Sequence, residues 1–209
     1  RDDYKGEFSD PQNASWLSYF NVNSDCILNP LKQALPFNPF KDMTGKTINE
    51  INLYASTLSS ALISVFGARV SANMEDMLRS AINKAYTDGK GAPITFADVL
   101  KNYKGNDPDR YDTVISSLNQ LIDAHIFRKS DDIDLMKNSY IVNLGQYPKD
   151  GPIAKAIVYF TISKLNNIYE NLPVQAKDDE RVELRHFTII DEAHYMLSFK
   201  NEPLRNLIA

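Results

Sequence analysis

The 209-residue sequence predicts an α/β fold in which a parallel sheet is interrupted by an α-helical insertion. Two observations lead to this prediction. Apolar, β-branched runs at residues 139–145 and 186–191 are each followed by a helix-like stretch, and this alternation is typical of parallel sheets. Before them, several amphipathic helical stretches follow one another without a strand. We therefore expect residues 1–30 and 139–209 to build the sheet and residues 31–138 to form the mainly helical insertion.

The composition indicates a folded protein rather than a basic nucleic-acid binder. Hydrophobic residues make up 43% of the chain and the formal net charge is −4, which excludes a globally basic surface. The single cysteine, Cys26, cannot form a disulfide within the chain. No apolar run approaches the roughly 18 residues of a membrane-spanning helix. We expect a soluble, cytoplasmic protein that does not use a membrane.

The N-terminal segment is rich in Asn, Asp, Ser and Pro. Its short apolar pieces, SYFNV at residues 18–22 and CILNPL at residues 26–31, predict brief strands or turns between loops. Pro36 and Pro39 in the following LPFNPF exclude a central strand there, because proline lacks the backbone N–H that a strand ladder uses.

Two long amphipathic helices are predicted next. The first covers residues 47–67, where Thr47 and Glu50 have the spacing of a capping box and apolar residues then recur on one helical face. The second covers residues 72–86 and ends at the glycines of TDGKG.

Two shorter helices complete the predicted insertion. One begins at Thr95, which has Asp98 three residues later, and runs to about Tyr103. The other is expected to start near Asp107, where a capping residue precedes a proline, and it carries Tyr111 in its apolar stripe.

The remainder of the chain alternates between strands and helices. SYIVNLG at residues 139–145 predicts a strand, and residues 153–172 predict an amphipathic helix. Residues 173–184 are charged and predict a surface loop. HFTIID at residues 186–191 predicts a buried strand, and EPLRNLIA at residues 202–209 has the pattern of a further helix.

The strand HFTIID ends in two adjacent carboxylates, Asp191 and Glu192. An apolar strand that delivers an acidic pair has the pattern of a Walker B element, because the carboxyl end of a buried parallel strand is where ligands bind. Asp191 would hold a magnesium ion, usually through water, and Glu192 would act as the catalytic base on the water that attacks the γ-phosphate. The alternative is that the two acids cap the next helix. His194 could couple the site to its surroundings or lie in a loop.

A Walker B element requires a phosphate-binding loop, and MTGKTINE at residues 43–50 contains the letters GKT. The P-loop motif G-x-x-x-x-G-K-[ST] would place its first glycine at position 40, which is Phe40, and the loop would follow a buried strand rather than LPFNPF. Thr47 already has a role as a helix cap. We therefore interpret GKT as a helix start.

Three segments resemble the HerA/FtsK group of P-loop ATPases, which are hexameric motors that act on DNA. DYKGEF at residues 3–8 is similar to that group's D-x-H-G-E-Y segment, although Lys5 replaces the usual His. HFTIIDEAHYML at residues 186–197 is similar to its Walker B strand, and EPLRNLIA is similar to the start of its next helix. Within the group, the chain most resembles the HerA-like ATPases of bacterial DNA-defence systems, such as the phosphorothioation-dependent restriction component.

This resemblance implies a partial RecA-like P-loop NTPase core that binds ATP and magnesium between the subunits of a homo-oligomeric ring. It also implies that the P-loop lies upstream of Arg1 and the arginine-finger segment beyond Ala209, so we expect a fragment of a DNA translocase or helicase with negligible activity on its own. Asp3 and Glu7 would face the nucleotide or the subunit boundary. Arg205 could contact a neighbouring subunit's phosphates or lie on an exposed helix.

Other functions have less support. A non-catalytic ATPase-like scaffold or DNA-binding module in a larger complex is the main alternative. A DEAH-type helicase is a third possibility, because the chain contains the letters DEAH, but the chain lacks the upstream P-loop and the following motifs of such helicases. The histidines and Cys26 show no metal-ligand spacing. Most aromatic residues fall on apolar stripes, which favours core positions over base stacking. Scattered lysines are expected at a solvated surface; they are Lys84, Lys90, Lys101 and Lys104.

Overall fold

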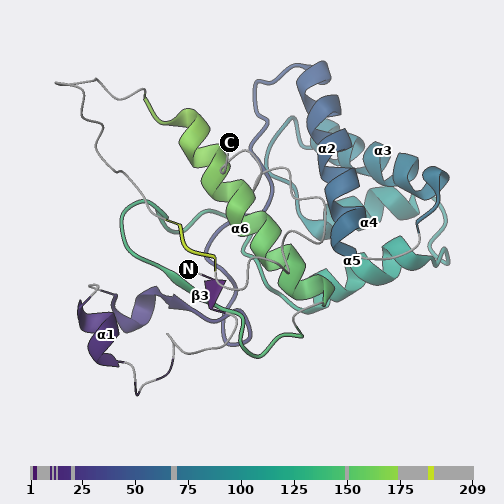
Figure 1. Cartoon of the computed structure of the whole chain (residues 1–209). Coiled ribbons are helices and arrows are strands. Elements are labelled where there is room, and N and C mark those ends of the chain that lie inside the picture. Colours follow the sequence, from purple (N-terminus) through teal and green to yellow (C-terminus); the bar gives the residue numbers. More distant parts are fainter. Residues whose placement is uncertain are drawn as a thin grey trace.

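Three short parallel strands and a set of longer helices make up the described part of the chain (Figure 1). The computed structural model describes residues 2–3, 10, 12, 14–19, 22–66, 70–148, 151–173 and 188–190. Its strands are β1 (Asp2–Asp3), β2 (Ile27–Leu28) and β3 (Ile141–Asn143), with β3 between the other two and parallel to both. The mixed α/β class and the parallel pairing are as the sequence predicts.

Helices account for most of the described residues. Their bounds are α1 (Ala14–Tyr19), α2 (Ile48–Phe66), α3 (Ala72–Asp88), α4 (Phe96–Lys104), α5 (Thr113–Asp123) and α6 (Pro152–Asn171). A 3-10 turn, η2 (Ser24–Cys26), precedes β2. Figure 1 shows α2 to α5 gathered together, with α6 running beside them and α1 apart.

Side-chain caps stand at the starts of α3 and α4, and the cap of α4 is the one that its sequence spacing predicts. The hydroxyl of Ser71 accepts a hydrogen bond from the backbone N–H of Met74 at the start of α3. At the start of α4, the Thr95 hydroxyl accepts from the Asp98 N–H at 3.2 Å, and the Asp98 carboxylate accepts from the Thr95 N–H at 2.8 Å. This reciprocal pair is a capping box.

Two predicted elements are wrong in detail. Helix α5 begins at Thr113 rather than near Asp107, and the Tyr111 side chain is 77% exposed instead of lying in the apolar stripe. The cause is tertiary, because the Asp112 carboxylate accepts both the Ile115 N–H at 3.0 Å and the buried Tyr103 hydroxyl at 3.0 Å. The hydrogen bond from Tyr103, which belongs to α4, holds Asp112 in place as the N-cap of α5.

The second difference is α1, which covers part of the segment SYFNV that was expected to form a brief strand or turn. A short apolar run cannot be assigned to a strand or a helix by periodicity alone. The N–H of Val22 donates to the Leu17 carbonyl at 2.8 Å just beyond this helix. The prediction for CILNPL is confirmed, because β2 lies within it and the preceding Cys26 is a buried free thiol.

Helix α6 begins with Pro152 at its first turn and packs against α2 and α5. Its Phe160 ring lies 5.6 Å from Phe40 and 5.5 Å from Phe96, measured between centroids. Such tilted and edge-to-face pairs are favourable arrangements of aromatic rings. The helix therefore shares a hydrophobic core with the helices that precede β3, and this core also includes Leu28 of β2 and Val142 of β3.

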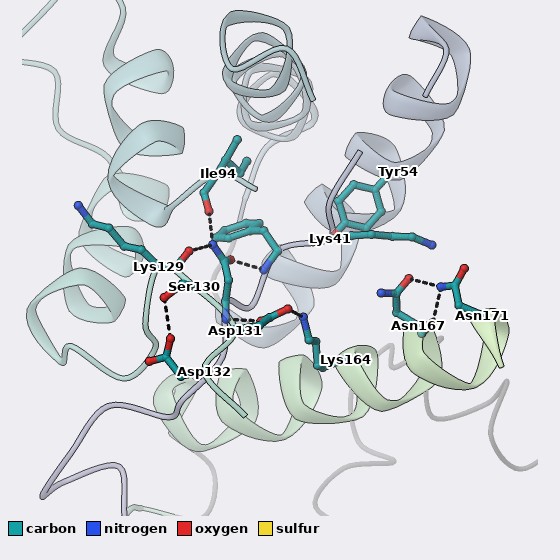
Figure 2. Close-up of polar contacts among 12 residues, drawn as sticks. Lys41, Tyr54, Ile94, Lys129, Ser130, Asp131, Asp132, Lys164, Asn167 and Asn171 are labelled. Atoms are coloured by element: carbon teal, nitrogen blue, oxygen red, sulfur yellow. Dashed lines mark hydrogen bonds and ion pairs between the residues drawn. The ribbon is translucent and has the colours of Figure 1, made fainter. Parts of the chain in front are cut away.

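An ion pair adds a polar contact to this packing. Lys164 of α6 pairs with the Asp131 carboxylate, which also accepts a hydrogen bond from the Asn38 N–H at 3.0 Å. Figure 2 shows Asp131 facing Lys164 on the helix. A second pair joins Lys41 to Glu170 at 3.4 Å. Both pairs link α6 to loops that lie before β3 in the sequence.

Candidate functional site

The carboxyl edge of the parallel sheet is the candidate functional site, because ligands of open parallel sheets bind beyond the carboxyl ends of the strands. Asp3 ends β1 directly beside Asn143, which ends β3. On the other side of β3, Leu28 pairs with Val142, so Asn29 follows β2 at the level of Asn143. A polar residue therefore stands at this edge in all three strands.

The two asparagines at this edge turn the chain out of the sheet. The Asn29 side-chain oxygen accepts the Leu31 N–H at 3.1 Å, and the Asn143 side-chain oxygen accepts the Gly145 N–H at 2.9 Å. These are Asx turns, in which the side chain replaces a backbone turn acceptor. Sequence reasoning did not single out either residue, although an asparagine at the end of an apolar run is a usable signal.

Of the predicted site residues, only Asp3 belongs to the described part of the chain. Asp3 lies in β1, where the structure describes its backbone. Glu7, Asp191 and Glu192 lie outside the described residues, as do His194 and Arg205.

Ile190 is the described residue nearest in sequence to the acidic pair. It forms a β-bridge and packs, partly buried, against the hydrophobic core. The sheet thus carries Asp3 to the candidate edge, and the positions of the acidic side chains stay predictions.

The segment containing GKT is a helix start. The Thr47 N–H donates to the Glu50 carboxylate at 2.7 Å, and the Glu50 N–H donates to the Thr47 hydroxyl at 3.3 Å. The predicted capping box is therefore confirmed. Hydrogen bonds from the Thr47 backbone and hydroxyl hold the pKa of Glu50 below its usual value. The Lys46 amine lies 3.5 Å from the same carboxylate, so the lysine pairs with Glu50.

The described residues also bear on the predictions for metal ligands, surface lysines and membrane spans. In the described part of the chain, no three His, Cys, Asp or Glu side chains are close enough together to hold a metal ion. Lys84, Lys90 and Lys101 are exposed on α3, in the turn after it and on α4, while the Lys104 amine donates to the Pro108 carbonyl at 3.0 Å. None of the helices in the described ranges combines the length and apolar character of a membrane span.

Comparison with known proteins does not assign the chain to a family. No protein-family model matches it, and a search of curated proteins finds no significant relative.

Proposed function

We propose that this chain is part of a HerA/FtsK-type ATPase that couples ATP hydrolysis to the translocation or unwinding of DNA, with DNA defence as its setting. The observation that carries the proposal is the parallel sheet, in which β3 has Asp3 beside its carboxyl end and leads into the long helix α6. A nucleotide bound at this edge would occupy the usual ligand position of a parallel α/β sheet. The sheet would then belong to a RecA-like core at residues 1–30 and 139–209, with residues 31–138 inserted.

The residue types at and after the strand ends suit a magnesium nucleotide. In this proposal Asp3 would bring a carboxylate oxygen and Asn143 an amide oxygen to this edge, and magnesium is bound through oxygen ligands. In the same proposal Asp191 would hold the ion, and Glu192 would orient the attacking water and accept its proton. The bound ion would neutralise charge on the phosphates. Asp3 and Glu7 would face the nucleotide or the next subunit of a homo-oligomeric ring.

Lys46 does not belong to the proposed phosphate cradle, since its amine pairs with Glu50 at a helix start. The phosphate-binding lysine would come from a P-loop outside residues 1–209. We therefore expect residues 1–209 alone to hydrolyse ATP negligibly.

The test uses the full-length protein that the gene encodes, assayed for magnesium-dependent ATPase activity with and without double-stranded DNA. Glu192→Gln should lower turnover by about 100-fold or more, because a general base typically contributes that much, while nucleotide binding persists. Lys46→Ala is the matched control and should retain full turnover. DNA should stimulate the wild-type enzyme.

Two outcomes would contradict the proposal. Loss of turnover in a folded Lys46→Ala variant would make GKT a phosphate ligand and would overturn the assignment of a separate P-loop. Absence of ATP binding and turnover in the full-length protein would favour the non-catalytic scaffold.

A further inference from the structure

We propose that a cavity beside the N-terminus of α4 binds an aromatic side chain from an acidic segment of a partner protein. The cavity has a volume of about 220 Å³ and is lined by residues 38–40, 94–97, 121–122 and 125–129. None of these residues belongs to the carboxyl edge of the sheet, so the inference is independent of the proposed ATPase activity.

The interior of the cavity is aromatic and aliphatic. The rings of Phe40 and Phe96 lie 4.8 Å apart in an edge-to-face arrangement, and Phe127 lies 6.2 Å from Phe96. Phe40 and Phe96 are buried, while Phe127 is half-buried. A further ring entering the cavity would extend this aromatic cluster, and such pairs are stabilising beyond the area that they bury.

Backbone hydrogen bonds hold one wall of the cavity in place. Leu35 and Phe127 form a parallel β-bridge. The Leu35 N–H donates to the Ile126 carbonyl at 2.6 Å, and the Arg128 N–H donates to the Leu35 carbonyl at 3.1 Å. Because this wall is ordered by contacts within the chain, a ligand need not order it on binding, which favours affinity.

The polar side chain of Asn38, which lines the cavity, has hydrogen-bond partners within the chain on both its nitrogen and its oxygen. Its amide nitrogen donates to the carbonyls of Ile94 at 3.3 Å and Lys129 at 2.8 Å, and its oxygen accepts the Phe40 N–H at 2.8 Å. Both N–H groups of the Asn38 amide are used within the chain, so a nucleobase would find no donor there, and unsatisfied polar groups are costly to bury. A hydrocarbon ring has no such cost.

Arg128 and Lys129 at the rim of the cavity are basic, and the lining contains no Asp or Glu. Asp98 and Asp131 lie next to the lining, where they accept hydrogen bonds from Thr95 and Asn38. Arg128 is paired with Asp132, whereas no ion pair in the described part of the chain involves Lys129, whose amine points away from the neighbouring labelled residues in Figure 2. An acidic residue beside the inserted ring would complement this rim.

The size of the cavity favours a single side chain as the occupant. Pockets for drug-sized molecules usually measure roughly 300 to 1,000 Å³, and this cavity is smaller. A buried aromatic anchor in a pocket of this kind is the typical centre of a protein–protein contact. The occupant is therefore assigned as an aromatic anchor flanked by acidic residues.

The test measures binding of a fluorescein-labelled peptide, Asp-Glu-Phe-Asp-Glu, to the purified chain by fluorescence polarisation. Replacing the peptide's Phe by Ala, or its acidic residues by Lys, should abolish detectable binding. In the protein, Ala97→Trp should weaken binding about tenfold or more, because Ala97 lines the cavity and is exposed at its rim. Lys129→Glu should weaken it about threefold or more, because it removes the unpaired cation.

Lys84→Glu is the matched control for charge, since Lys84 is exposed on α3 and does not line the cavity. It should change the affinity less than about twofold. Circular dichroism verifies that each variant is folded. Equal binding of all peptides, no binding of the acidic peptide, or unchanged binding by folded Ala97→Trp would overturn the proposal. If the protein instead binds the oligonucleotide dT10, and both Ala97→Trp and Lys129→Glu weaken that binding, the cavity is assigned to nucleic acid.

Discussion

At the scale of single residues, Tyr86 shows how a polar group is accommodated in the core. Its side chain is fully buried, and its hydroxyl donates to the Lys41 carbonyl at 2.9 Å. The Lys41 N–H in turn donates to the Tyr54 hydroxyl at 3.2 Å. The two tyrosines thus satisfy both backbone groups of Lys41 and fasten the loop after Phe40 to α2 and α3. Burial raises the pKa of Tyr86, and the neighbouring Tyr54 adds to the rise.

This raised pKa predicts a loss of stability in alkali. A tyrosine in the unfolded chain ionises near pH 10, whereas buried Tyr86 stays protonated, so its contribution to stability is complete below about pH 10 and is lost as pH rises above it. Tyr86→Phe should reduce the steepness of that loss and should lower the free energy of unfolding at neutral pH by about 1 kcal/mol, through the lost hydrogen bond.

Urea denaturation at a series of pH values measures both effects. Tyr111→Phe serves as the control, because the Tyr111 side chain is 77% exposed. If the alkaline loss is as steep in Tyr86→Phe as in the wild type, burial of Tyr86 is not its source.

At the scale of elements, Gly91 joins the end of α3 to the loop before α2. Its N–H donates to the Tyr86 carbonyl at 2.8 Å and its carbonyl accepts the Met43 N–H at 2.8 Å. Its φ of +84° favours glycine, and a Cβ placed there would lie 2.4 Å from the Met43 carbonyl oxygen. Gly45 also has a positive φ, +76°, but a Cβ there would meet nothing within 4 Å.

These two glycines separate backbone strain from steric clash. Gly45→Ala should lower the free energy of unfolding by about 1 to 2 kcal/mol, because left-handed backbone is unfavourable for alanine. Gly91→Ala should cost about 1 to 3 kcal/mol more, because the loop must also shift away from the added methyl group. Urea denaturation of both variants checks the difference. Equal changes in the free energy of unfolding would mean that the Met43 backbone moves away from the added methyl group without a measurable loss of stability.

The same scale shows what the sequence could and could not predict. Helices α2, α3, α4 and α6 follow from caps and apolar periodicity, which are local signals. The start of α5 did not follow, because Asp112 is fixed by Tyr103 of another helix. Of the candidate site, the motif Asp191–Glu192 is a local pattern and remains a prediction, whereas the alignment of Asn29 with Asn143 depends on strand register, which short runs do not specify.

At the scale of the whole molecule, a continuous hydrophobic core joins residues from β2 through α6. It includes Leu62 of α2, Val142 of β3 and Phe160 of α6. The helices predicted as an insertion therefore pack directly against α6, which follows the central strand. The basic-rimmed cavity belongs to the helical side of this core, and the candidate nucleotide edge belongs to the sheet.

The pairing of β2 with β3 has a consequence for the order of folding. Ile27 pairs with Ile141, and the helices α2 to α5 all lie in the chain between these two residues. Closing so long a loop is entropically unfavourable until the intervening chain is compact, whereas contacts between consecutive helices are local and form quickly. Pulsed hydrogen exchange during refolding should therefore protect the amides of α3 and α4 before those of β3. Protection of β3 before α3 and α4 would instead indicate that the sheet nucleates the fold.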